Sequence, residues 1–273
     1  MSIITISRGS YSKGKEVAEK VAQRMGYECI SRDVILEASE EFSVPEIRLV
    51  RAIHDAPSIL NRFSYKKEKY ISYIQLALLR TFHKDNVVYH GLAGHFFVKE
   101  ISHVLKARII ADMQDRVKYE MAQEGISREE ALEILKKDDE ERRKWSQMLY
   151  GIDTHDSSLY DLVLHIHKIT VDDAVDIICH TAGLKHFHTT PDSKRAMDDL
   201  LLSAEVKAAL MEIKFGVEVS AQDGHVSVKI EAPVTKELRL ADEIETAAKK
   251  VPGVKDVKIE VLHITPYSTP FSD

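Results

Sequence analysis

A short glycine-containing stretch near the start of the chain constrains the fold more than any other feature. Residues 9–16 read Gly-Ser-Tyr-Ser-Lys-Gly-Lys-Glu. An apolar, β-branched run at 3–6 precedes them, and apolar residues at helical spacing follow, up to Gly26. We interpret these flanks as a buried parallel strand and an amphipathic helix that ends at the glycine. A strand, a glycine loop and a helix together favour phosphate binding, because backbone N–H groups turn inward at the positive end of the helix.

The loop therefore supplies the candidate nucleotide-binding residues, which are Gly9, Ser10, Tyr11, Ser12, Lys13, Gly14, Lys15 and Glu16. Lys15 follows the second glycine, where the lysine of a phosphate-binding loop contacts the outer phosphates. A serine or threonine that binds Mg²⁺ usually comes next, but this chain has Glu16. Glu16 either binds Mg²⁺ or points outward as a first-turn acid that complements the helix dipole, and we favour the second. A plain turn between strand and helix is the alternative for the whole stretch.

Composition limits the possible partners. The chain has 273 residues, enough for two domains, and its formal net charge of −6 excludes an overall basic surface for nucleic acid or anionic membranes. No uncharged apolar stretch is long enough to predict a membrane span. The two cysteines fall in predicted apolar elements and indicate free thiols in a reducing compartment. Because the N-terminus shows no secretion signal, we expect a cytoplasmic protein.

The first part of the chain alternates strands and helices. Strands are predicted at 3–6, 27–30, 87–91, 107–111 and 160–166, with helical patterns between them, including residues 43–84. This alternation predicts an α/β fold with a parallel sheet and helices on both faces. Arg32 and Asp33 follow the second strand, where open α/β sheets bind ligands, so they are candidate substrate-binding residues. Asp33 is equally well explained as a helix N-cap.

A charged helical hairpin is predicted between the fourth and fifth strands. Asp112 can cap its first helix, and Ser127 with Glu130 forms a capping box for the second. Residues 136–144 place opposite charges at i, i+3 and i+4 spacing, which on composition alone predicts a salt-bridged, solvated helix.

The C-terminal part is predicted to be a separate domain. Residues 183–192 are expected to be a linker, 193–265 a small αββαβ domain and 266–273 a tail. Within that domain helices are predicted at 193–211 and 235–250, strands at 213–219, 225–230 and 254–262, and a hairpin turn at Asp223-Gly224. His-x-His occurs at 165/167 and at 186/188, but no cysteine or carboxylate partners lie nearby at zinc-like spacing, so the sequence predicts no metal site.

Taken together, residues 1–182 resemble the cytidylate-kinase-like family of P-loop nucleoside monophosphate kinases. The first strand and the glycine loop carry the resemblance, and the family itself often has Glu at the position of Glu16. Three further matches are Ser31-Arg32-Asp33-Val34-Ile35, the lid motif Asp139-Glu140-Glu141-Arg142, and the last strand and helix at 160–164 and 170–174. Residues 193–265 resemble a BON domain through their helix, Asp-Gly hairpin and Pro-Gly-Val-x-x-Val segment.

The first resemblance implies a P-loop nucleoside monophosphate kinase fold with a helical lid. It implies transfer of the γ-phosphoryl group of ATP to a pyrimidine nucleoside monophosphate such as CMP or dCMP, with ATP and Mg²⁺ as cofactors. Lys15 would contact the β- and γ-phosphates, and Arg142 on the lid would stabilise the transferred group, with Arg116 and Arg143 in support. Acids at 138–141 would pair with the lid arginines while the lid is open. The second resemblance implies regulation, homo-oligomerisation or binding of a small ligand.

Three positions depart from the family pattern. Leu92 stands where an arginine usually contacts the acceptor phosphate, Lys13 where glycine is common, and His165 where asparagine is favoured. A nucleotide-binding regulatory or sensor protein without efficient turnover is therefore the alternative to an active kinase.

Overall fold

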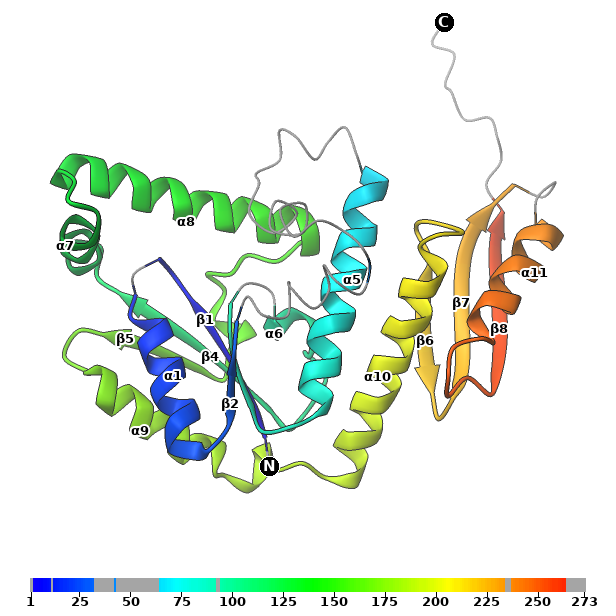
Figure 1. The fold of residues 1–273 in the computed structure, drawn as a ribbon, viewed down its shortest axis with the longest axis horizontal. Helices are drawn as coiled ribbons and strands as arrows, with labels where there is room; N and C mark the ends of the chain where they lie inside the picture. Colours follow the sequence, from blue (N-terminus) through cyan, green and yellow to red (C-terminus); the bar gives the residue numbers. More distant parts are fainter. Residues whose placement is uncertain are drawn as a thin grey trace, which may run out of the picture.

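The first part of the chain folds around a parallel sheet. The structure is a computed structural model, and it describes residues 2–10, 12–31, 42, 64–91, 94–233 and 237–263. Five strands lie in the order β2-β3-β1-β4-β5 (Figure 1). They are β1 Ile3–Arg8, β2 Glu28–Ile30, β3 Val87–His90, β4 Val104–Ala111 and β5 Leu162–Ile166. Every neighbouring pair is parallel, which confirms the prediction; β4 begins at Val104 rather than at 107.

Helices cover both faces of this sheet, as predicted. Ile4 and Ile6 of the central strand β1 pack with α1 (Gly14–Met25) and α9 (Val171–Ala182) in one core. Ile3 faces the opposite side and packs with α5 (Ser64–His83) and α6 (Gly94–Phe97). Alternation of side chains along a strand places these residues in two separate cores. α1 ends at Gly26, whose left-handed φ of 67° confirms the predicted C-terminal glycine.

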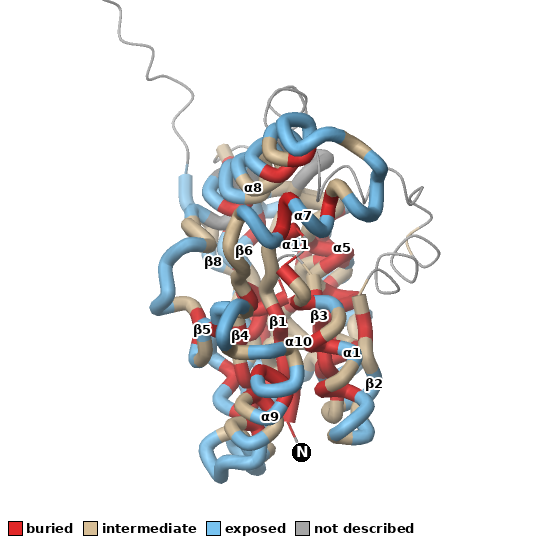
Figure 2. Tube along the Cα trace, turned by 90° about the vertical axis from the view of Figure 1, so that its left-hand side faces the viewer, coloured by how far each residue is buried: buried red, intermediate tan, exposed pale blue. Residues whose placement is uncertain are grey.

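The predicted hairpin follows β4 and lies across the top of the sheet in Figure 1. It consists of α7 (Met113–Glu124) and α8 (Arg128–Tyr150). Ser127 and Glu130 form the predicted capping box at the start of α8. Asp112 holds the N-cap position of α7, but its side chain makes no capping hydrogen bond. β1 and β3 are largely buried, whereas the outer sides of α7 and α8 are exposed (Figure 2).

The C-terminal part has the predicted αββαβ order. Its elements are α10 (Pro191–Leu210), β6 (Glu218–Gln222), β7 (His225–Ala232), α11 (Glu237–Ala248) and β8 (Asp256–His263). β7 pairs antiparallel with β6 and parallel with β8. Asp223 and Gly224 have φ of 50° and 86°, as a type I′ hairpin turn requires. The strand predicted at 213–219 begins only at Glu218, because the N–H groups of Ile213 and Lys214 donate to the Leu210 carbonyl and continue the turn after α10.

α10 packs on both parts of the chain. Met197, Ala204 and Ala208 are buried in the core that contains α5, whereas Val206 and Leu210 are buried in the core of the C-terminal sheet. Figure 1 shows α10 between α5 and that sheet. The predicted linker at 183–192 contains the short 3-10 helix η2 (Lys185–Phe187) and the start of α10; a second short helix, η1 (Ser157–Leu159), precedes β5. In the described part of the chain, no helix is long and apolar enough to cross a membrane.

Candidate phosphate-binding site

The glycine loop connects β1 to α1, as the sequence predicts. Its geometry depends on two residues at the start of α1. A Cβ atom at Gly14 would lie 2.6 Å from the Cβ of Arg8, closer than atoms can approach, so only glycine fits there. Lys13 is the N-cap and has a left-handed φ of 67°. That conformation explains why glycine is common at this position in the family that the loop resembles.

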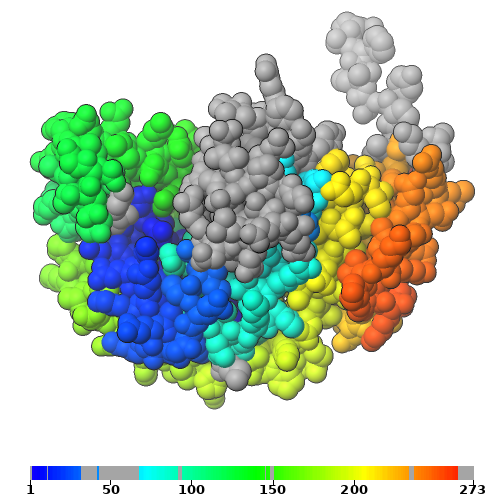
Figure 3. All heavy atoms as spheres, viewed as in Figure 1, coloured from blue at the N-terminus to red at the C-terminus, as the bar shows by residue number. Residues whose placement is uncertain are grey.

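The loop lines a pocket of about 610 Å³, which is in the size range of small-molecule sites. Six of the predicted nucleotide-binding residues contribute to its wall: Ser10, Ser12, Lys13, Gly14, Lys15 and Glu16. Arg8 at the end of β1 also lines it. So do Tyr119 from α7 and Asp138 and Arg142 from α8, the two helices of the hairpin that forms the lid. The structure therefore brings the loop and the lid together around one hollow. Figure 3 shows the surface of the lid helices (green) against that of the loop and α1 (blue).

Arg8 and Arg142 make this pocket suitable for an anion. Burial, together with the nearby Arg142 charge, lowers the pKa of Arg8. Burial also lowers the pKa of Arg142. One guanidinium N–H of Arg142 donates to the Arg8 carbonyl at 3.3 Å, and the buried Nε of Arg8 has no hydrogen-bond partner among the described residues. Two desolvated cations close together are stabilised when a negatively charged group comes between them.

Arg116 joins the loop to the lid. Its side chain is only 8% exposed, its Nε donates to the Ser10 carbonyl at 2.7 Å, and its two terminal nitrogens donate to the Asp139 carboxylate at 2.7 and 2.9 Å. The Ser10 hydroxyl donates to Asp138 at 3.0 Å. The lid helix is therefore not a simple solvated helix, because Asp138, Asp139 and Arg142 all face the loop.

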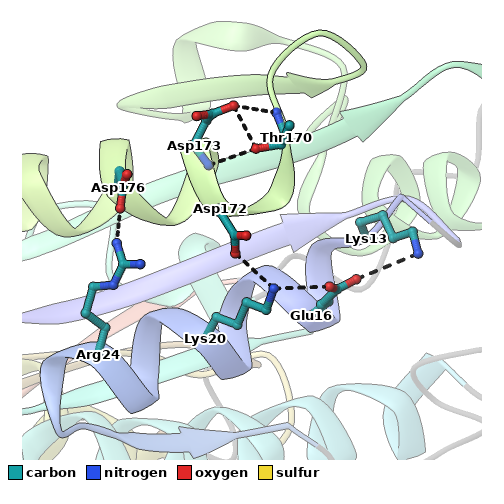
Figure 4. Close-up of polar contacts among 8 residues, drawn as sticks. All are labelled: Lys13, Glu16, Lys20, Arg24, Thr170, Asp172, Asp173 and Asp176. Carbon is teal, nitrogen blue, oxygen red and sulfur yellow. Dashed lines mark hydrogen bonds and ion pairs between the residues drawn. The ribbon is translucent and has the colours of Figure 1, made fainter.

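Lys15 and Glu16 begin α1 and are more exposed. The Lys15 side chain is 65% exposed and lies 3.7 Å from Glu19. Glu16 lies in the first turn of α1, where it pairs with Lys13 at 3.7 Å and Lys20 at 3.4 Å, and it also lines the pocket. Figure 4 shows these pairs, together with the Lys20–Asp172 pair that joins α1 to α9. Lys15 is the more exposed of the two loop lysines, because the Lys13 side chain is only 38% exposed.

Arg143 lies away from the pocket, unlike its neighbour Arg142. Its guanidinium pairs with Asp153 at 3.0 Å, and its side chain is 60% exposed. Successive residues on a helix point in different directions, so only one of two adjacent arginines can face the loop. The structure brings Lys15, Arg116 and Arg142 together at the loop and leaves Arg143 outside.

A smaller pocket of about 190 Å³ adjoins the first and shares Arg8, Ser12 and Arg142 with it. Arg108 of β4 also lines it and was not identified from the sequence. Arg108 donates to the Tyr160 hydroxyl at 3.2 Å, which in turn donates to Ser7 at 3.3 Å. The one available signal was a basic residue within the strand predicted at 107–111.

Four of the predicted positions lie outside the described residues. Tyr11 of the loop, the candidate substrate-binding residues Arg32 and Asp33, and Leu92 after β3 belong to this group. Their predicted roles stay predictions.

Comparison with known proteins agrees with this geometry. The Cytidylate kinase-like family matches residues 3–168. The cytidylate kinase of Thermococcus sibiricus is 35% identical over 108 residues, which make up 40% of this chain and only 54% of that enzyme. The cytidylate kinase of Sulfolobus acidocaldarius is 23% identical over 188 residues, which are 68% of this chain and 97% of that enzyme.

Among solved structures, an uncharacterized protein from Eubacterium ventriosum shares the fold, with a TM-score of 0.52 and 22% identity over 67% of this chain and 98% of that protein. The chain spans about half the length of the Thermococcus sibiricus enzyme that it matches. The family match, however, covers more than half of this chain and runs from β1 through β5, including the glycine loop and both lid helices. The chain therefore belongs to the cytidylate kinase-like family.

Proposed function

We propose that the protein is an ATP-dependent nucleoside monophosphate kinase that phosphorylates a pyrimidine nucleotide of the CMP or dCMP type. The observation that carries this proposal is that two desolvated arginines, Arg8 and Arg142, line the pocket of about 610 Å³ at the glycine loop. Phosphoryl transfer depends on positioning and charge neutralisation rather than on a covalent enzyme intermediate. Cations from both the loop and the lid supply that neutralisation.

ATP fits the residues present. The loop at 9–15 would hold its phosphates, Lys15 would contact the outer phosphates, and Arg8 and Arg142, which line the same pocket, would contact the transferred group. Mg²⁺, when bound with ATP, neutralises part of the phosphate charge. Closure of α8 over the loop would exclude water, which otherwise competes with the acceptor for the phosphoryl group.

Two lid acids accept hydrogen bonds from groups that could also donate to a phosphate. Asp138 accepts from the Ser10 hydroxyl, and Asp139 accepts from Arg116. A phosphate oxygen is an equally good acceptor for both donors. We infer that ATP competes with these carboxylates, so that the same arginines and serine are held in place with and without nucleotide.

Arg108 offers a cation for the acceptor phosphate. The family usually has an arginine after the third strand, and this chain has Leu92 there. Arg108 lines the smaller pocket next to Arg8 and Arg142, on the side of the loop that faces β4. In this proposal Arg108 compensates for Leu92, and Arg32 and Asp33 complete the acceptor site.

The second candidate function is a nucleotide sensor that binds ATP without efficient turnover. It is favoured by Leu92 and by the C-terminal part, whose αββαβ order supports the BON-like assignment of 193–265. In both cases we propose that residues 1–182 carry the nucleotide site and that the C-terminal part, through oligomerisation or a small ligand, regulates it. The proposed compartment is the cytoplasm, where ATP is abundant.

A coupled assay with ATP and each common nucleoside monophosphate tests the proposal. We expect turnover with CMP or dCMP, and loss of ATP binding or turnover in Lys15→Ala. Lys137→Ala is the matched control, because Lys137 is an exposed lysine of α8 that does not line the pocket. ATP binding without turnover on any monophosphate supports the sensor. Unchanged affinity and rate in Lys15→Ala contradicts the loop assignment.

A further inference from the structure

A cluster of histidine and aspartate side chains lies at the edge of the sheet where β4 and β5 end. Asp112 follows β4 directly, Asp115 lies in the first turn of α7, His165 is in β5 and His167 follows it. Ala111 of β4 pairs with Ile166 of β5 in a parallel register, so the two exits lie side by side. The carboxylates that the sequence lacked near the 165/167 histidine pair therefore come from about fifty positions earlier in the chain.

Three ligand atoms converge in this cluster. The Nδ1 atom of His167 lies 3.3 Å from Asp112 Oδ2 and 3.5 Å from Asp115 Oδ2. The three residues each offer one such atom, and all three atoms lie within 4.8 Å of one another. Ligands bound at about 2.1 Å to a tetrahedral ion are about 3.4 Å apart, which is the bond length multiplied by about 1.63. The two separations between His167 and the carboxylates match that spacing.

In each carboxylate the second oxygen, Oδ1, does not face His167 and contacts another side chain. Asp112 Oδ1 lies 3.1 Å from His165 Nε2, and Asp115 Oδ1 accepts from Lys118 Nζ at 3.2 Å. Metal ligands in proteins are typically oriented in this way by groups outside the coordination sphere. Asp112 also forgoes its expected role, since it holds the N-cap position of α7 without a capping hydrogen bond and turns to β5 instead.

We propose that Asp112, Asp115 and His167 bind a divalent transition-metal ion of the Zn²⁺ or Co²⁺ class, with His165 and Lys118 as outer partners. One imidazole nitrogen and two carboxylate oxygens suit such an ion, whereas Mg²⁺ and Ca²⁺ are bound by oxygen ligands. Three protein ligands leave one tetrahedral position for water. The side chains of the three ligands are 46–54% exposed, so an ion can reach them from solvent.

The bound ion would fix the start of α7 to the end of β5. Asp115 is adjacent in sequence to Arg116, which bonds the Ser10 carbonyl of the glycine loop. The metal would thus act as a clamp on the helix that carries Arg116. The metal site itself lies outside the proposed nucleotide site, because neither pocket at the loop includes Asp112, Asp115 or His167.

Zn²⁺ titration of the full chain against a chromophoric chelator tests the proposal, with the visible spectrum of the Co²⁺-loaded protein as a second readout. We expect one equivalent of tightly bound Zn²⁺ and the intense absorption of four-coordinate Co²⁺. His167→Ala and Asp115→Asn should weaken Zn²⁺ binding more than 100-fold, whereas His165→Ala, an outer partner, should weaken it about 10- to 100-fold.

His188→Ala is the matched control, because it alters the other His-x-His pair and should leave the equivalent of Zn²⁺ and the Co²⁺ spectrum unchanged. Circular dichroism verifies that each variant is folded, as expected for exposed side chains. Equal Zn²⁺ affinity in His167→Ala and the unaltered chain overturns the proposal. So does the absence of stoichiometric Zn²⁺ binding, which would mean that His167 simply contacts the two carboxylates without a metal.

Discussion

Arg116 and Asp139 form a two-pronged ion pair, with N–O distances of 2.7 and 2.9 Å, at the junction between the glycine loop and the lid. The third contact of the same guanidinium, from Nε to the Ser10 carbonyl, ties this pair to the loop backbone. Arg116 is buried, so leaving its guanidinium without these partners would cost the folded chain stability. The pair therefore sets both the stability of the lid contact and the shape of the loop.

Replacing Asp139 with Asn should destabilise the folded chain. The amide offers one acceptor in place of two and no charge, so a buried guanidinium is left incompletely paired, at a cost of about 2–3 kcal/mol. Urea unfolding followed by circular dichroism measures the change. Glu140→Gln is the control, since Glu140 makes an exposed pair with Lys144 and its loss should leave stability nearly unchanged. Equal effects of the two substitutions would contradict the structural role of Asp139.

Arg142→Ala should reduce kcat more than ATP affinity. If Arg142 stabilises charge that develops on the transferred group, its loss lowers kcat by about 100- to 1,000-fold. Arg143→Ala is the matched control, because Arg143 pairs with Asp153 outside the pocket and should leave kcat close to that of the unaltered enzyme. Steady-state kinetics with ATP and CMP distinguishes the two. An equal loss of kcat and ATP affinity in Arg142→Ala would mean that this arginine only binds nucleotide.

Lys13→Gly should stabilise the fold and weaken nucleotide binding. The left-handed φ of 67° at Lys13 costs a side-chain-bearing residue about 1–2 kcal/mol, and the entropy of glycine offsets part of the gain, so we expect about 1 kcal/mol of net stabilisation. The loss of a cation from the pocket should raise the Kd for ATP.

Lys13→Ala separates these effects, because it removes the charge and keeps the strained backbone. Calorimetric melting and ATP titration of both variants provide the measurements. A melting temperature that does not distinguish Lys13→Gly from Lys13→Ala would argue against strain at this position.

Stability should fall as the pH drops from 7 to 5. Burial lowers the pKa of His95 to about 3, so the folded chain keeps this imidazole neutral while the unfolded chain protonates it below about 6.5. The unfolded state then binds the extra proton, and the free energy of unfolding decreases by about 1.4 kcal/mol per pH unit between those two pKa values. That amounts to about 2 kcal/mol from this group by pH 5. Burial also lowers the pKa of His103, which acts in the same direction.

Denaturant midpoints at pH 7 and pH 5 test this expectation, and His95→Phe should reduce the difference between them. His186→Phe, at an exposed position, serves as the control. A pH dependence that is identical in His95→Phe and the unaltered chain would exclude His95 as its source.

Local patterns in the sequence were sufficient for the sheet and for the loop. The five strands, the capping box at Ser127 and the Asp223-Gly224 turn depend on neighbouring residues, and the structure confirms each. The predicted start of β6, at residue 213, was wrong because the turn after α10 continues through Lys214. Apolar residues in this turn pack in the core without pairing in the sheet.

Contacts between distant segments could not be predicted in the same way. The choice between Arg142 and Arg143 depends on which side of α8 faces the loop, and that is set by Arg116 and Asp139. Arg108 and the Asp112–His167 contact depend on the register between β4 and its neighbours. These relationships arise from topology rather than from spacing along the chain.

α10 belongs at once to two apolar interiors, since Met197 and Ala204 are buried with α5 and Val206 and Leu210 with the C-terminal sheet. Displacing this one helix would therefore expose apolar side chains of both cores to water. Neither half should unfold while the other stays folded. The chain should accordingly show a single calorimetric transition. Any ligand that tightens the C-terminal sheet should raise the melting temperature of the nucleotide-binding half as well.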